Sequence, residues 1–248
     1  MTTKTASILG LDTADGAYLA RLLLARGYRV SGTGGTGLLA RLGIANDIAT
    51  SDPDRIDEVY DLRFAAAGVP GLLESTGRAR VFVAIPGTEP VPAAIAAARA
   101  ADRFVVAGQM FDRESRLGPG TGFVARIVAA VFDDADPVPA DLAAAADCGW
   151  TPEYVDPMWR MLQRSAPADF VLATGRALGG HEVARHAFAY FGRDATRFGN
   201  GAATGAVTGD PGPARTELGW SAVTWGRDLV RTLCEGIAEE QKIQPARA

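Results

Sequence analysis

The chain has 248 residues, of which 48% are hydrophobic and 22% charged, and its formal net charge is −4. This composition is typical of a folded globular protein and excludes wholesale disorder and a disulfide scaffold. The sequence has no basic stripe and no apolar run of membrane-spanning length, so we expect neither nucleic acid nor a membrane as a partner. Two cysteines, Cys148 and Cys234, and the absence of a leader-like N-terminal pattern favour a cytoplasmic location.

The first 35 residues carry the pattern of a dinucleotide-binding unit. Buried strands are predicted at residues 5–9 and 28–31, with a helix between them at 17–26. The turn that joins the first strand to the helix contains Gly10 and Gly16. Strand, glycine-flanked turn, helix and strand form the opening of a doubly wound, dinucleotide-binding sheet.

Strands and helices continue to alternate after this opening, which predicts an α/β fold with a Rossmann-like, doubly wound parallel sheet. The expected strands are 58–62, 81–85 and 104–107, the expected helix is 91–101, and 113–122 is expected to be a loop.

The pattern changes near residue 150 and predicts a smaller C-terminal lobe. Helices are expected at 151–165, 181–191 and 225–241, and a short strand at 170–173. We therefore expect a nucleotide-binding domain at 1–146 and a smaller lobe at 147–248, interdigitated with the first.

Four stretches of the chain resemble a known family. They are 10–32 with the run DGAYLA, 147–163 with DCGWTPEYVD, 173–192 with ATG and AFAY, and 209–220 with GDP and LGW. In this order they resemble the GDP-mannose 4,6-dehydratases, which are extended short-chain dehydrogenase/reductases. The matching stretches cover roughly half of the chain.

The resemblance implies binding sites for NADP and for a nucleotide sugar. It assigns the cofactor to the turn after the first strand, at Gly10, Thr13, Asp15 and Gly16, and makes Arg126 the candidate for a substrate phosphate. The family acts through a Thr or Ser, a Glu and a Tyr-x-x-x-Lys pair. In that pair the Tyr is the base at the sugar 4-hydroxyl, and the Lys lowers the pKa of the Tyr.

The chain departs from this pattern at the catalytic positions. Its only lysines are Lys4 and Lys242, and neither follows a Tyr by four residues. Residues 103–107 resemble the strand that leads to the family's Thr-Ser-Glu, but residues 108–110 are Gly-Gln-Met and carry no hydroxyl or carboxyl group. No base for hydride abstraction is evident.

The chain also departs from the family at the cofactor turn. The family has Gly where Thr13 stands, and Asp12 adds a carboxyl group near the expected phosphates. The arginines that hold the 2′-phosphate in the family are replaced by residues 34–36, which are Gly-Gly-Thr.

These observations leave three functions open. The first is a catalytically degenerate relative that binds a nucleotide or nucleotide sugar, or acts as a subunit beside a partner protein or copies of itself. The second is an active NADP-dependent nucleotide-sugar dehydratase or epimerase that uses other groups, with Asp15, Tyr18, Asp112 and Glu114 as candidates. The third is a structural oligomer without a ligand.

Two further motifs have ordinary structural explanations. Residues 32–37 satisfy G-x-G-x-x-G, but the helix after them is short, which favours a flexible loop over a second phosphate loop. His181 and His186 are five residues apart, so on a helix they diverge by about 140°. We therefore expect no metal site.

Overall fold

The computed structural model describes residues 3–50, 55–117, 120–198 and 205–243. The chain forms two compact units that alternate along the sequence. Unit 1 comprises Met1–Met110, Thr151–Leu172 and Pro211–Ser221, and unit 2 comprises Phe111–Trp150, Ala173–Asp210 and Ala222–Ala248.

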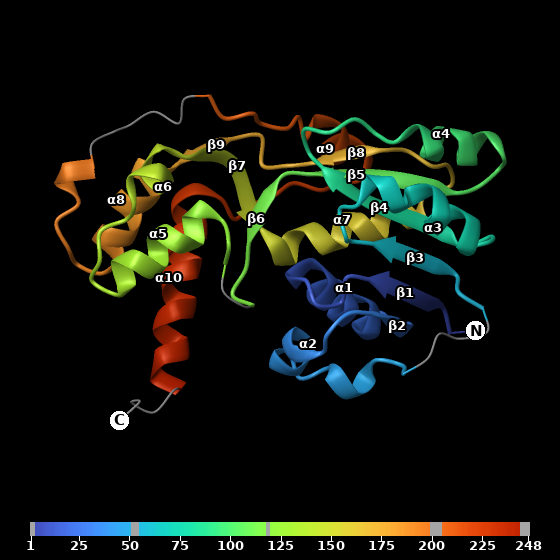
Figure 1. Cartoon of the computed structure of the whole chain (residues 1–248), viewed down its shortest axis with the longest axis horizontal. Coiled ribbons are helices and arrows are strands. Elements are labelled where there is room, and N and C mark those ends of the chain that lie inside the picture. The colour runs from blue at the N-terminus through green and yellow to red at the C-terminus, as the bar shows by residue number, and fades with distance from the viewer. Residues whose placement is uncertain (1–2, 51–54, 118–119, 199–204, 244–248) are drawn as a thin grey trace. The chain divides into compact units, whose positions relative to one another are not determined.

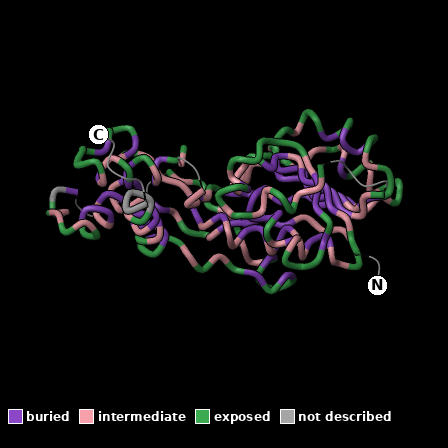
Figure 2. Tube along the Cα trace, turned by 90° about the horizontal axis from the view of Figure 1, so that it is seen from below, coloured by how far each residue is buried: buried purple, intermediate pink, exposed green. Residues whose placement is uncertain are grey.

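Unit 1 is built on a six-stranded parallel sheet with the order β2-β1-β3-β4-β5-β8 (Figure 1). The predicted Rossmann-like, doubly wound fold is confirmed. The strands are β1 (Thr5–Leu9), β2 (Arg29–Thr33), β3 (Glu58–Asp61), β4 (Arg80–Pro86), β5 (Val105–Met110) and β8 (Phe170–Leu172). They are buried along most of their length, as Figure 2 shows in purple, because a parallel sheet is covered on both faces.

Helices cover both faces of this sheet. On one face, α3 and α4 pack with Val81, Val83 and Ile85, which are alternate residues of β4. Phe82 points to the other face, where it contacts Tyr60 and where α1 packs against α7. The helices of unit 1 are α1 (Ala14–Ala25), α2 (Gly37–Arg41), α3 (Val69–Ser75), α4 (Ala93–Ala100), α7 (Thr151–Gln163) and α9 (Gly212–Glu217), with 3-10 turns at Ala45–Asp47 and Ala66–Gly68.

Unit 2 has its own small sheet and apolar core. The strand β7 (Ala145–Trp150) pairs in parallel with β6 (Asp112–Glu114) and antiparallel with β9 (Ala177–Gly179). The helices are α5 (Phe123–Phe132), α6 (Pro139–Ala143), α8 (Gly180–Tyr190) and α10 (Gly226–Ile243), with a 3-10 turn at Thr196–Phe198. Apolar residues of α5, α8 and α10 form one cluster together with Cys148 and Leu178.

Two of the expected boundaries were wrong. The loop expected over 113–122 begins with strand β6, because residues 112–114 pair with β7, which lies more than thirty residues away in the chain. The helix expected over 17–26 begins earlier, at Ala14, because Thr13 caps it.

A buried carboxylate at the amino end of β3 organises one face of unit 1. Glu58 is 1% exposed, and its Oε1 accepts hydrogen bonds from Lys4 Nζ (2.9 Å), Tyr28 Oη (3.0 Å) and Gln163 Nε2 (3.0 Å). Its Oε2 accepts a bond from Tyr60 Oη at 2.7 Å. Lys4 precedes β1, Tyr28 precedes β2 and Gln163 ends α7, so the carboxylate links β3 to three segments that are distant in sequence.

Removing one donor from this network should destabilise the fold. In Tyr60→Phe, Glu58 Oε2 loses its 2.7 Å partner inside the protein, and we expect the free energy of unfolding to fall by about 1–3 kcal/mol. Urea denaturation followed by circular dichroism measures this change.

The matched control is Tyr190→Phe, because Tyr190 is 41% exposed on α8. It should change the free energy of unfolding by less than about 0.5 kcal/mol. Equal stability of the wild-type and Tyr60→Phe proteins would show that the network does not stabilise the sheet.

Candidate functional site

The carboxyl edge of the unit 1 sheet is the candidate site. Ligands of doubly wound sheets bind beyond the carboxyl ends of the strands, where the strand order reverses. In this sheet β1 lies between β2 and β3. The chain therefore continues from β1 to β2 on one side of β1 and then crosses to β3 on the other side. The turn that follows Leu9 therefore lies at the reversal point.

Two glycines give this turn its shape. Gly10 has φ of +102°, and its N–H donates to the carbonyl of Thr33 at 3.1 Å. A Cβ on Gly16 would lie 2.1 Å from the carbonyl oxygen of Gly10, so only glycine fits there. Tight turning and close packing of the helix on the strand are the roles that glycines have in dinucleotide-binding turns.

Thr13 is the N-cap of α1. Its Oγ1 accepts a hydrogen bond from Gly16 N (3.0 Å) and donates one to the carbonyl of Gly10 (2.7 Å). Its carbonyl also accepts from Ala17 N, at 3.0 Å. The Thr13 hydroxyl thus satisfies one of the four N–H groups that a helix start leaves without an intrahelical partner, while the Thr13 carbonyl accepts the first intrahelical bond. The Thr13 hydroxyl is folded into the turn, beside the positive end of the helix dipole.

An ion pair that the sequence analysis did not identify lies at the same edge. Asp61 ends β3 and is 2% exposed, and it accepts hydrogen bonds from Arg63 Nε (2.8 Å) and Nη2 (2.9 Å). These bonds raise the pKa of the Arg63 guanidinium. The intervening Leu62 lies against Gly10. The signal in the sequence was an Asp at the end of a buried strand. It was missed because the expected strand, 58–62, included Asp61.

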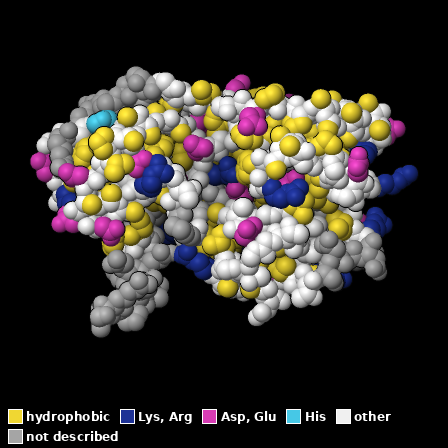
Figure 3. Space-filling view, viewed as in Figure 1, with side chains coloured by type: hydrophobic (Ala, Val, Ile, Leu, Met, Phe, Trp, Pro, Cys, Tyr) yellow, Lys and Arg dark blue, Asp and Glu magenta, His cyan; other side chains and the backbone are white. Residues whose placement is uncertain are grey.

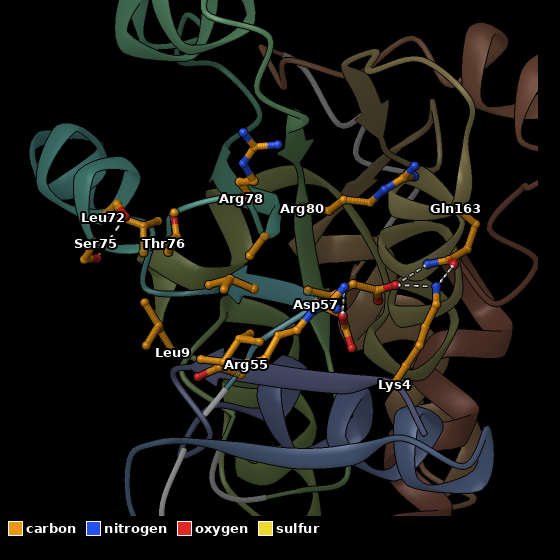
Figure 4. A pocket seen from close by; sticks show the side chains of 16 residues that line it. Lys4, Leu9, Arg55, Asp57, Leu72, Ser75, Thr76, Arg78, Arg80 and Gln163 are labelled. Carbon is orange, nitrogen blue, oxygen red and sulfur yellow. Dashed lines mark hydrogen bonds and ion pairs between the residues drawn. The ribbon is translucent and has the colours of Figure 1, made fainter. Parts of the chain in front are cut away.

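The lysine of unit 1 lies at the opposite edge. Lys4 precedes β1, and a cavity of about 1160 Å³ opens beside it. Figure 4 shows Lys4 and Gln163 pointing toward each other at this cavity. The two carboxylates in the lining are already engaged, because Glu58 binds Lys4 and Asp57 binds Thr5 and Arg55. Residues at the amino ends of β1, β3 and β4 line this cavity, and it extends along β1 to Leu9.

Arg126 belongs to unit 2, on α5. Its Nη2 lies 2.5 Å from Oδ1 of Asp141, its Nε donates to the same carboxylate, and its Nη1 donates to the carbonyl of Thr121. The bonds to Asp141 raise the pKa of the guanidinium. The Arg126 side chain remains 52% exposed, whereas that of Asp141 is 8% exposed. Arg126 is thus a positioned cation with half of its surface open to solvent.

Glu114, on β6, is a buried carboxyl group of unit 2. Burial raises its pKa to about 7, against the opposing effect of a hydrogen bond from Ala125 N at 3.3 Å. Gly122 leaves the space for this carboxyl, since a Cβ there would lie 2.3 Å from Glu114 Oε1. Burial also raises the pKa of the neighbouring Asp112.

The four candidate cofactor residues lie together in the structure. Gly10, Thr13, Asp15 and Gly16 form one turn of unit 1, with Asp15 buried in the first turn of α1. Tyr18 is buried on the same helix and contacts the guanidinium of Arg21. Asp112 and Glu114 lie on β6 of unit 2, the unit that also holds Arg126.

The thiols and imidazoles do not form a reactive site in the described part of the chain. Both cysteines are buried, which raises the pKa of Cys148 and brings that of Cys234 to about 12. His186 lies 3.6 Å from the carboxylate of Glu182, on its own helix. Among the described residues, no group of three or more His, Cys, Asp or Glu side chains is arranged to hold a metal.

The surface features also bear on possible partners. Acidic and basic side chains are interspersed with apolar ones on the face shown in Figure 3. Within the described ranges, none of the helices has the length and apolar character needed to cross a membrane.

Comparison with known proteins identifies the family. The family model of GDP-mannose 4,6 dehydratase matches residues 93–233, which is more than half of the chain. The chain belongs to this family.

Individual relatives match over shorter segments. GDP-mannose 4,6 dehydratase 2 of Caenorhabditis elegans is 30% identical over 116 residues, covering 38% of this chain and 30% of the relative. GDP-mannose 4,6-dehydratase of Sinorhizobium fredii is 33% identical over 124 residues, covering 40% and 34%. The matched segments thus span about a third of the length of these relatives.

Solved structures of low identity share the fold. A dTDP-glucose 4,6-dehydratase from Bacillus anthracis, in complex with NAD, has a TM-score of 0.74 at 7% identity, covering 97% of this chain and 98% of that one. A UDP-glucuronic acid 4-epimerase from Bacillus cereus, with NAD and a fluorinated UDP-sugar, has a TM-score of 0.75 at 14% identity, covering 95% and 99%.

The raised pKa of Glu114 predicts a specific dependence of stability on pH. Between pH 4.5 and about 7 the unfolded chain has released this proton and the folded chain has not. Rising pH therefore favours the unfolded state over that interval, by at most about 3 kcal/mol. Glu114→Gln has no ionisable group at this position. We therefore expect this variant to be more stable relative to wild type at pH 8 than at pH 5.

Thermal or urea unfolding at the two pH values measures the difference. Glu74→Gln, at an exposed position of α3, is the control and should show the same offset from wild type at both. A Glu114→Gln offset that does not change with pH would contradict the assignment.

Proposed function

We propose that this member of the GDP-mannose 4,6 dehydratase family binds a nicotinamide dinucleotide at the 10–16 turn and the phosphates of a nucleotide sugar at Arg126. We further propose that it acts as a binding or partner subunit, without the Tyr–Lys chemistry of the family. The proposal has three supports, which are the turn, the position of the lysines and the exposed guanidinium.

The turn supports dinucleotide binding. Gly10 and Gly16 have the geometry that such a turn needs, and the Thr13 hydroxyl is held inside it. Backbone N–H groups at the start of α1 would face the pyrophosphate, which the helix dipole favours. The structures of similar fold from Bacillus anthracis and Bacillus cereus contain NAD. When bound, a nicotinamide ring supplies a site for hydride transfer.

The position of the lysines is the main support for the proposal that the Tyr–Lys pair is missing. Lys4 donates to the buried Glu58 at the amino edge of the sheet, whereas the turn lies at the carboxyl edge. Lys242 lies in α10 of unit 2. In the described turns that follow β1 and β3, the charged side chains are Asp12 and Arg63, and the Arg63 guanidinium is paired with Asp61. This edge therefore offers binding groups without a lysine that would lower the pKa of a tyrosine.

Arg126 supports recognition of phosphate in unit 2. A guanidinium binds phosphate oxygens through paired hydrogen bonds, and Asp141 holds this one in a fixed orientation. Half of its side chain stays exposed, so an incoming phosphate can reach it.

An active enzyme with a different base is the second candidate function. The observation that favours it is Glu114, whose pKa of about 7 suits a general acid or base at neutral pH. Its contact with Ala125 N at the start of α5 gives it a structural role as well. Turnover that Glu114→Gln abolishes, with substrate binding retained, would establish this function in place of the first.

We also propose a cytoplasmic location and assembly with copies of this chain or with a partner protein. Two buried, unpaired cysteines support a reducing compartment. Light scattering on the purified protein, followed by capture from the native host, tests the assembly.

The test of binding is calorimetric titration of the protein with NAD⁺, NADP⁺, GDP and GDP-mannose. We expect binding of a dinucleotide and of GDP-mannose, without formation of the 4-keto-6-deoxy sugar. Arg126→Ala should weaken GDP-mannose binding at least about tenfold, because it removes a charge-assisted hydrogen bond to a phosphate. Dinucleotide binding should not change.

Arg231→Ala is the matched control, because Arg231 is 59% exposed in the same unit and also pairs with an aspartate. Since Arg126→Ala leaves Asp141 without its partner, Arg126→Lys and the unfolding midpoint of each variant are measured in parallel. Product formation by the wild type would exclude the degenerate form, and binding of none of the four compounds would point to a structural oligomer.

A further inference from the structure

The end of β2 decides between NAD and NADP in dinucleotide-binding folds. An acidic side chain there binds the 2′-hydroxyl of the adenosine ribose, whereas an arginine accommodates the 2′-phosphate of NADP. In this chain β2 ends at Thr33, and residues 34–37 are Gly-Gly-Thr-Gly. The segment that normally carries the selective residue thus has no charged side chain.

An acidic side chain reaches this place from the neighbouring turn. The backbone N–H groups of Gly10 and Leu11 both donate to the carbonyl of Thr33, at 3.1 and 3.0 Å. These bonds hold the next residue, Asp12, against the chain that leaves β2. A Cβ on Gly34 would lie 2.7 Å from Asp12 Oδ1 and 2.7 Å from Asp12 N, so the carboxyl group lies directly beside Gly34.

The backbone at Gly34 is adapted to this contact. Gly34 has φ of +134°, a conformation that residues with a side chain rarely adopt. Any side chain there would overlap both the backbone and the carboxyl group of Asp12. The Asp12 carboxyl group can therefore lie here only because residue 34 has no side chain.

From this arrangement we infer that Asp12 selects NAD over NADP, an inference that rests on the proposed dinucleotide site. Asp12 replaces in space the acidic residue that β2 lacks in sequence. Its carboxyl group accepts a hydrogen bond from the ribose 2′-hydroxyl, and its negative charge repels a 2′-phosphate.

The surrounding charges favour the same cofactor. The first cation after β2 is Arg41, the last residue of α2, so none of the residues from Thr33 to Ala40 could neutralise a 2′-phosphate. Asp12 itself is exposed and makes no hydrogen bond or ion pair with the residues that the structure describes. Its oxygens are therefore available to a ligand. This selectivity differs from the NADP that the family resemblance implied.

The experiment measures the dissociation constants of NAD⁺ and NADP⁺ for the wild type, Asp12→Asn and the control Asp47→Asn. We expect the wild type to bind NAD⁺ at least about tenfold more tightly than NADP⁺, which corresponds to about 1.4 kcal/mol. Asp12→Asn removes the charge and keeps the shape, so this preference should fall to within about threefold. Asp47→Asn removes one charge from another position in unit 1 and should leave the preference unchanged.

Ionic strength provides a second readout. Salt screens the repulsion between an exposed carboxylate and a 2′-phosphate, so NADP⁺ binding to the wild type should improve relative to NAD⁺ as salt rises. Asp12→Asn should lack that trend.

The outcomes separate this inference from the proposed function. Equal or tighter binding of NADP⁺ by the wild type, or an unchanged preference in Asp12→Asn, would overturn the selectivity and leave dinucleotide binding intact. If the wild type bound neither dinucleotide, the proposed function would fail, and the selectivity with it.

Discussion

The carbonyl of Thr33 holds the candidate site of unit 1 together. It accepts hydrogen bonds from two successive N–H groups, those of Gly10 and Leu11, and so ties the turn after β1 to the end of β2. The turn thereby places the cap residue Thr13 at the start of α1 and Asp12 beside Gly34. Without that bifurcated bond the glycines could still turn the chain, but the acidic side chain would have no defined position at the sheet edge.

Buried carboxylates organise both units, and each has donors drawn from distant segments. In unit 2, Asp147 is 1% exposed and accepts hydrogen bonds from Thr174, Gly175 and Gly209. Glu58 has the same role in unit 1 with side-chain donors. A buried charge is tolerated only when it is fully hydrogen-bonded, so these two residues specify which segments lie together. Burial raises the pKa of Glu114, and the hydrogen bond from Ala125 N opposes this shift.

The two edges of the unit 1 sheet carry different groups. The carboxyl edge of unit 1 combines Gly10, with φ of +102°, the capped start of α1 and the Asp61–Arg63 pair. The amino edge holds Lys4, which is paired with the buried Glu58. The turn depends on backbone geometry, whereas any chemistry at this edge would depend on a few side chains, so one fold can hold different activities.

The sequence by itself determined the fold class and the family, and it located the glycine turn after β1. These depend on local signals, namely apolar periodicity, the glycines at 10 and 16 and the ordered family stretches. Only the tertiary structure decided the remainder. Strand β6 depends on pairing with β7, the Asp61–Arg63 pair depends on where β3 ends, and the Lys4–Glu58 contact joins residues 54 positions apart. Asp12 was expected near the phosphates, and its contact with Gly34 became visible only once β1 and β2 were paired. Such contacts follow from register and burial, which residue spacing along a single strand does not encode.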